Sequence, residues 1–147
     1  MLLLPGQAST PLVASGEQTS QGTFSRDGRW VAYASAPSDE LFVQAFPISG
    51  PRRQISVSGG AMPAWRADGK EIVYLGLDGF VYSVRLDPAR GEFQAAEPLF
   101  RVRNSPNSTE HLTLAVTREG SRILFAQAID QPESGVINVA LHRSPAP

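Results

Sequence analysis

The sequence predicts an all-β protein built from one repeated β-hairpin unit. A ten-residue pattern occurs three times, at residues 24–33, 65–74 and, in a weaker form, 116–125. Each copy contains a large apolar residue, two spacers, an acidic residue, a glycine, a polar residue and an apolar run that ends in an aromatic side chain. The glycines of the copies are spaced by about 40–50 residues, a period typical of propeller blades. We therefore expect about three four-stranded antiparallel blades, half of a six-bladed β-propeller.

The pair formed by an acidic residue and glycine is expected to make the turn between the first two strands of each blade. Asp27-Gly28 and Asp68-Gly69 lie between apolar runs, which is typical of a two-residue turn in which both residues have positive φ. Glu119-Gly120 keeps the glycine but favours this turn less. Inner strands are therefore predicted at residues 22–25, 62–66 and 112–117, and second strands at residues 29–35, 70–75 and 121–127.

The outer half of each blade follows from alternation and from proline. Third strands are predicted at residues 40–46, 80–86 and 136–142, where apolar and polar residues alternate in places. Fourth strands are predicted at residues 52–57 and 98–102, whereas Pro145 and Pro147 disfavour a fourth strand in the third copy. Residues 2–4 and 11–14 are interpreted as two strands that precede the first full blade. No helical periodicity is sustained.

Together these elements predict a single partial propeller domain over residues 1–147. Its parts are residues 1–15, which belong to a preceding or exchanged blade, and blades at residues 22–57, 62–102 and 112–142, the last without its outer strand. Closed propellers typically have about 4–8 blades, so two interpretations remain open. Either two copies close a six-bladed ring, with residues 11–14 of one chain completing the third blade of the other, or the chain is a fragment of a longer one.

The first copy resembles the TolB-like, WD40-like propeller repeats of bacteria, whose blade motif is Ser-Pro-Asp-Gly followed by an apolar run that ends in Ala-Tyr. Arg26 replaces the proline of that motif, and Glu119 replaces the aspartate in the third copy. The resemblance extends to propellers fused behind bacterial Ser/Thr kinases, through residues 40–47, 54–56, 59–60, 63–65 and 137–141. It implies that the chain corresponds to the C-terminal half of such a propeller and has a sensor or scaffold role.

Composition narrows the classes of partner. The chain has 147 residues, 13 basic and 14 acidic, with a net charge of −1 and no basic stripe, so nucleic acid is not an expected partner. The absence of cysteine excludes disulfides, thiolate metal sites and cysteine nucleophiles. The apolar run at the N-terminus stops at Pro5, and no stretch approaches the roughly 20 apolar residues of a membrane span, so membrane insertion is not expected.

No catalytic or metal-binding pattern emerges from the sequence. The Gly-x-Ser-x-Gly motif is absent, and the chain has only two histidines, His111 and His142. Glu110 and His111 are adjacent in sequence and would point to opposite faces of a strand. The acidic residues Asp27, Asp68 and Asp78 are expected to serve their own turns. We therefore expect no enzyme, no metal and no cofactor.

Binding is expected on the loops, while the repeated aromatic residues pack between blades. The aromatic set is Phe24, Trp30, Tyr33, Trp65, Tyr74 and Phe125. The longest non-repeating loop spans residues 103–111, and residues 16–21, 36–39, 76–79 and 130–135 should surround the same face. Candidate binding residues are Arg103, Asn107, Glu110, His111, Asp78 and Glu17.

These observations predict a non-enzymatic propeller module that binds a protein or peptide as a sensor or scaffold. The alternative is the propeller cap of a peptidase similar to prolyl oligopeptidase, or a small hydrolase. The neighbouring reading frame would separate the two. A kinase or winged-helix segment upstream favours the sensor, and an α/β-hydrolase segment downstream favours the peptidase cap.

Overall fold

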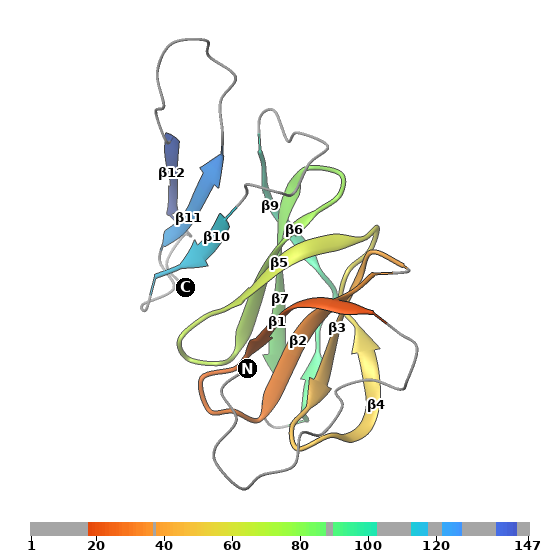
Figure 1. Cartoon of the computed structure of the whole chain (residues 1–147). Helices are drawn as coiled ribbons and strands as arrows, with labels where there is room; N and C mark the ends of the chain where they lie inside the picture. The colour runs from red at the N-terminus through yellow and green to blue at the C-terminus, as the bar shows by residue number, and fades with distance from the viewer. Residues whose placement is uncertain are drawn as a thin grey trace, which may run out of the picture.

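The computed structural model describes residues 18–36, 38–87, 90–102, 113–117, 122–127 and 138–143. Within these ranges the chain forms strands β1 to β12 and no helix, as the sequence predicts (Figure 1). No helix of the described ranges is therefore long and apolar enough to cross a membrane. The predicted strands at residues 2–4 and 11–14 lie outside the described residues, as does the predicted loop at residues 103–111.

The first sheet, here called blade 1, contains four antiparallel strands in the order β1-β2-β3-β4. Its strands are β1 (Thr19–Phe24), β2 (Trp30–Ser35), β3 (Glu40–Ala45) and β4 (Ser49–Gln54). The outer strand β4 begins three residues before the predicted position, because a tight turn over residues 46–48 already reverses the chain after β3. Pro51 is tolerated in β4 because the strand lies at the edge of the sheet.

The second sheet, blade 2, repeats this arrangement and adds one short strand. Its strands are β5 (Gly60–Trp65), β6 (Glu71–Gly76), β7 (Phe80–Asp87) and β9 (Glu97–Arg101), and β8 (Glu92–Phe93) pairs with the C-terminal end of β7. The sequence did not predict β8. The third sheet, blade 3, has the order β10-β11-β12, with β10 (Thr113–Val116), β11 (Arg122–Gln127) and β12 (Asn138–Arg143).

The first strands of the three blades lie beside one another. Strand β5 contacts β1 on one side and β10 on the other, so the blades are arranged around their inner strands (Figure 1). This is how propeller blades surround a central axis. The predicted all-β fold with four-stranded antiparallel blades is therefore confirmed for the described residues.

The hairpin turns differ from the predicted type. Within each Asp-Gly pair only the glycine has a positive φ, 70° for both Gly28 and Gly69. Both residues of each pair were expected to have a positive φ. The N–H of Gly28 donates to the carbonyl of Ser25 at 2.9 Å, which closes a four-residue turn whose last residue is the left-handed glycine. The Asp27 carboxylate then accepts from the N–H of Arg29 at 3.1 Å. The aspartate thus accepts a hydrogen bond within the turn, while its own backbone is not in the left-handed region.

The core is divided between the two faces of blade 2. Successive residues of a strand point to opposite faces, so β6 sends Ile72 and Tyr74 toward blade 1 and Val73 and Leu75 toward blade 3. The first cluster also contains Ala32, Ala34, Leu41, Val43, Ile55 and Val84. The second also contains Val81, Val102, Leu114 and Ile123. Blade 2 is therefore covered on both faces, which explains its nearly continuous apolar second strand.

Candidate functional site

The described residues contain one of the predicted binding residues, Asp78. The others, Glu17, Arg103, Asn107, Glu110 and His111, lie outside the described residues. Asp78 is exposed in the turn between β6 and β7, beside the segments that join the outer strand of one blade to the inner strand of the next. We call this surface the loop face and define it by residues 36, 38–39, 55–60 and 76–80.

Both carboxylate oxygens of Asp78 have partners within blade 2. One oxygen accepts from the N–H of Phe80 at 3.0 Å, and the other accepts from the Tyr82 hydroxyl at 2.6 Å. The hydrogen bond to Asp78 raises the pKa of Tyr82 above its ordinary value, because ionisation of the phenol would break that bond. Asp78 therefore stabilises the turn and holds the Tyr82 hydroxyl at the loop face.

Two stacked tyrosines lie beneath this turn. The rings of Tyr74 and Tyr82 are 5.3 Å apart and inclined by 15°. Two glycines make room for them, since a Cβ at Gly60 would lie 2.8 Å from the Tyr74 ring and a Cβ at Gly76 would lie 2.7 Å from the Tyr82 ring. Burial raises the pKa of Tyr74. The sequence did not predict this cluster, because the need for glycine arises from the neighbouring strand rather than from a turn.

Hydrogen bonds join the loops of blades 1 and 2. The Glu40 carboxylate accepts from the N–H of Gly59 at 3.1 Å and from the Ser56 hydroxyl. The Ser56 hydroxyl oxygen accepts in turn from the N–H of Leu41 at 2.8 Å. The N–H of Gly60 donates to the carbonyl of Asp39 at 2.8 Å. The loop face is therefore cross-linked by hydrogen bonds between the two blades.

Two apolar side chains are exposed on this cross-linked surface. Val57 is 65% exposed and Leu77 is 55% exposed. Leu77 lies over the segment that follows β4, since a Cβ at Gly59 would come within 2.9 Å of Leu77 Cγ. We call Val57 and Leu77 the loop-face patch.

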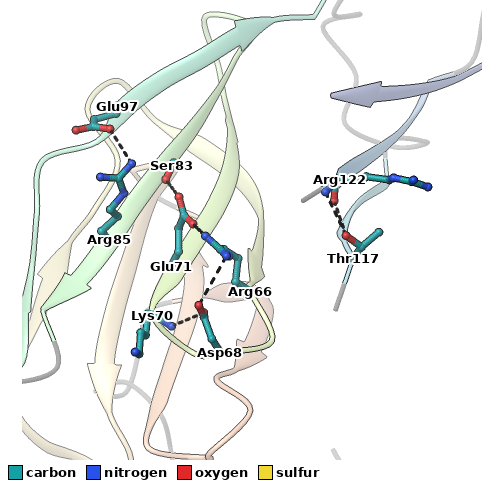
Figure 2. A network of polar contacts seen from close by, with 9 residues as sticks. All are labelled: Arg66, Asp68, Lys70, Glu71, Ser83, Arg85, Glu97, Thr117 and Arg122. Atoms are coloured by element: carbon teal, nitrogen blue, oxygen red, sulfur yellow. Dashed lines mark hydrogen bonds and ion pairs between the residues drawn. The ribbon is translucent and has the colours of Figure 1, made fainter. Parts of the chain in front are cut away.

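A cleft of about 480 Å³ opens at the opposite end of blades 1 and 2. Its apolar wall includes Trp30, Phe46 and Leu86, and its charged residues are Asp27, Arg29, Asp68 and Lys70. The cleft lies between the first hairpin turns of the two blades, and we call it the turn-face cleft. Figure 2 shows the turn of blade 2 with Asp68, Lys70 and their neighbours.

Three of the predicted aromatic residues, Trp30, Trp65 and Tyr74, pack between blades 1 and 2, whereas Tyr33 stacks on Phe42 of its own blade with 6.1 Å between ring centres. Phe93 of β8 lies between the two tryptophans, 5.2 Å from Trp30 and 6.2 Å from Trp65, in edge-to-face arrangements. Phe24 was expected to pack in the same way as Trp65, its counterpart in the repeat, but it is 50% exposed. No described strand precedes blade 1 to cover Phe24, which contacts Phe46 instead at 5.0 Å. The side chain of Phe125 lies outside the described ones.

The acidic residues of the turns act on their own backbones. Asp68 accepts from the N–H of Lys70 at 3.0 Å, as Asp27 and Asp78 do from the residues two positions after them. The predicted structural role of these three carboxylates is thus confirmed. Within the described ranges, no group of three or more histidine, aspartate or glutamate side chains could hold a metal ion.

Solved structures show what the chain is similar to. The acylaminoacyl peptidase of Pyrococcus horikoshii matches with a TM-score of 0.51 and 15% identity over 82% of this chain and 19% of that one. The beta-propeller domain of Swd1 from Myceliophteria thermophila matches with a TM-score of 0.54 and 10% identity over 88% and 44%. A putative 6-phosphogluconolactonase from Bacteroides uniformis matches with a TM-score of 0.51 and 15% identity over 86% and 40%.

These similarities extend to the fold alone. No family model and no curated protein matches the sequence, so the expected TolB-like family stays a prediction. The chain spans less than half the length of each of the three structures it resembles. The shared feature is the arrangement of four-stranded antiparallel sheets, and the chain is accordingly a partial β-propeller.

Proposed function

We propose that this chain is a non-enzymatic propeller module that binds a protein or peptide through its loop face. The loop-face patch carries the proposal, since Val57 and Leu77 are both more than half exposed on loops that hydrogen bonds join. Exposed apolar side chains in a fixed arrangement bind with a small loss of conformational entropy. A sensor or scaffold role is the finer form of the proposal, and the resemblance to TolB-like repeats supports it.

Aromatic and arginine side chains next to the patch support the same proposal. The Arg101 guanidinium lies 5.8 Å from the centre of the Phe80 ring, at the end of blade 2 that carries the patch. Tyr82 is half-buried beside them. Tyrosine and arginine are enriched among the residues that contribute most to binding in protein interfaces.

The peptidase-cap interpretation stays a prediction of the sequence. The similar structures include a peptidase, a propeller domain and a putative lactonase, so the fold does not choose among these activities. We expect the isolated chain to hydrolyse no peptide, ester or glycoside in a substrate screen. Activity that disappears in the His111→Ala variant would overturn the proposal that the module is non-enzymatic.

Two copies of the chain are proposed to close a six-bladed ring. In support, blade 3 has three strands among the described residues where blade 1 has four and blade 2 has five, so β12 offers an edge to a further strand. Deletion of residues 1–14 should then weaken the dimer, because residues 11–14 are proposed to pair with β12 of the other copy. Light scattering of both forms measures this, and a stable monomer of the full chain at micromolar concentration would contradict it.

Selection from a random nonapeptide display library tests the loop face directly. Peptides recovered on the wild-type chain are measured again on a variant with Val57→Asp and Leu77→Asp, which should lower their affinity at least tenfold. The matched control is Ala95→Asp, which changes an exposed apolar residue outside both the loop face and the lining of the turn-face cleft. Recovered peptides whose affinity is the same on the loop-face variant would argue against binding at this patch.

A further inference from the structure

The turn-face cleft combines a fixed apolar wall with a charged rim. Trp30 forms part of the wall, and the Phe93 ring packs against it edge-to-face with 5.2 Å between ring centres. The cleft volume of about 480 Å³ is within the range of roughly 300–1,000 Å³ that is usual for ligand sites. The cleft is thus large enough for a few residues of an extended peptide.

The repeat supplies each side of the cleft with one cation and one apolar residue. In blade 1, the N–H of Phe46 donates to the carbonyl of Arg29 at 2.7 Å. In blade 2, the N–H of Leu86 donates to the carbonyl of Lys70 at 2.7 Å. The two pairs occupy equivalent positions of the repeat and line the same cleft. A peptide that crosses the cleft therefore meets a cation beside an apolar side chain on both blades.

The two carboxylates at the rim already have partners within their own turns. Asp27 accepts from the Ser25 hydroxyl at 2.6 Å and from the N–H of Arg29 at 3.1 Å, and these bonds lower its pKa. Asp68 accepts from the N–H of Lys70 at 3.0 Å, and its second oxygen lies 3.8 Å from Nη2 of Arg66. Neither carboxylate needs a ligand to supply a hydrogen-bond donor.

The two cations, by contrast, keep donors for a ligand. The side chain of Arg29 is 81% exposed, and its contact with Asp27 is a long one of 3.8 Å. Lys70 is exposed and forms no ion pair with any carboxylate of the described residues. Charge-assisted hydrogen bonds to carboxylates are the strongest that such donors form. The rim carries two cations and two carboxylates, but only the cations keep unused donors, so the ligand group that fits them is negatively charged.

Exposed aromatic rings extend the apolar wall beyond the cleft. Phe46 lines the cleft and is 40% exposed. It contacts the 50% exposed Phe24 edge-to-face, with 5.0 Å between ring centres. Exposed apolar groups that lie together are typical of interaction surfaces.

We propose that the turn-face cleft binds an extended acidic peptide, whose carboxylates pair with Arg29 and Lys70 while a neighbouring apolar side chain packs on Trp30 and Phe46. This site is separate from the loop face, which lies at the other end of the blades. Its occupation does not depend on the function proposed for that face.

The same random nonapeptide library tests this proposal with different variants. Peptides lost on the variant with Arg29→Glu and Lys70→Glu, but kept on the variant with Val57→Asp and Leu77→Asp, define the pool that binds the cleft. This pool should be at least threefold enriched in aspartate and glutamate over the starting library. The double charge reversal should lower affinity at least tenfold. The matched control Arg53→Glu reverses an exposed charge on β4, away from the cleft, and should change affinity less than twofold.

NMR titration with the tightest peptide of this pool locates the contact. The indole N–H signal of Trp30 should shift, and Phe46→Ser should reduce the shift and the affinity. A pool that is basic or unenriched in acidic residues would overturn the proposal, as would the absence of any peptide that depends on Arg29 and Lys70. An equal loss of affinity in the Arg53→Glu control would also overturn it, since the effect would then reflect net charge alone. Loss on the loop-face variant only would support the loop-face proposal and contradict this one.

Discussion

The two faces of blade 2 are built from the same strands and contact their neighbours differently. Toward blade 1, the face is apolar along its length, and Ile72, Tyr74 and Val84 pack with the Trp30–Phe93–Trp65 cluster. Toward blade 3, only the half nearer the loop face is apolar. The other half carries a chain of polar contacts from Arg66 through Glu71 to Ser83 (Figure 2). Neighbouring residues of one strand thus serve two kinds of interface.

The polar half depends on a single position of the repeat. Ser25, Arg66 and Thr117 are equivalent residues at the end of the first strands. The hydroxyls of Ser25 and Thr117 bond the backbone five residues later, with N–H contacts of 3.0 Å and 3.2 Å. Arg66 instead pairs with the Glu71 carboxylate at 2.5 Å, and Ser83 donates to the same carboxylate. Exchanging a hydroxyl for a guanidinium therefore moves the polar contact from the turn onto the face of the sheet.

The first prediction separates the two faces by their cores and has the largest expected effect. Ile72→Ala should lower the free energy of unfolding by about 2–5 kcal/mol, because it leaves a cavity in a fully buried cluster. Val73→Ala removes fewer atoms from the opposite face and should cost less. Urea denaturation of both variants measures the difference. A larger loss for Val73→Ala would mean that the interface with blade 3 stabilises the fold more than the apolar one.

The second prediction tests whether the blades share one turn. Gly28→Val should cost roughly 1–3 kcal/mol, because φ is 70° there while the space around it is open. Gly69→Val should cost a similar amount, since its φ is also 70°. The control is Gly22→Val, at a position with equally open space and no left-handed φ. Thermal melts in which all three variants match the wild type would contradict the turn assignment.

The third prediction tests the Arg66–Glu71 pair. Arg66→Met should destabilise the chain by about 1–2 kcal/mol, because it leaves the Glu71 carboxylate with a hydroxyl but without its cation. The pair is partly exposed, so the effect is smaller than for a fully buried one. Adding Glu71→Leu and Ser83→Ala to Arg66→Met should recover most of the loss, because no buried hydroxyl is then left without its acceptor. A double-mutant cycle with additive effects would show that the two side chains do not interact energetically.

The fourth prediction concerns pH and is the smallest. Hydrogen bonds from Ser25 and Arg29 lower the pKa of Asp27 below its ordinary value of 3.8. Its folded-state pKa is therefore below the unfolded one, so its contribution is complete above pH 3.8 and is lost as pH falls through the lowered pKa. Asp27→Asn should lower the melting temperature slightly at pH 6 and no longer do so in strong acid. A difference that persists unchanged at acid pH would contradict this origin.

The sequence anticipated the strands better than the contacts between them. The Asp-Gly turns and the apolar runs after them located β2 and β6 within one residue. Alternation located β3 and β7 equally closely, because a half-buried strand repeats with a period of two. Strand β8 was missed, since two residues carry no period and their pairing depends on where β7 ends. The exposure of Phe24 was also missed, because its counterpart Trp65 is covered by the preceding blade and Phe24 is not covered by a described strand.

The candidate site, too, was predicted from the sequence only in part. The turn role of Asp78 follows from local sequence, because an aspartate before glycine can accept from the backbone two residues later. Its bond to Tyr82 could not be predicted, since it requires the two strands of a hairpin to set the distance between the side chains. The turn-face cleft was not foreseen at all, because its residues come from both blades.

The sequence by itself determined the features that depend on a few neighbouring residues: the repeated hairpins, the glycines at positive φ, the capping aspartates and the alternating faces of the strands. These are local because φ and ψ preferences and the period of two act within a turn or a strand. Only the tertiary structure decided which face of blade 2 is apolar throughout and why glycine is needed at positions 60 and 76. It also decided that Arg29 and Lys70 line the same cleft. Packing between blades joins residues far apart in the chain, and no local pattern records those distances.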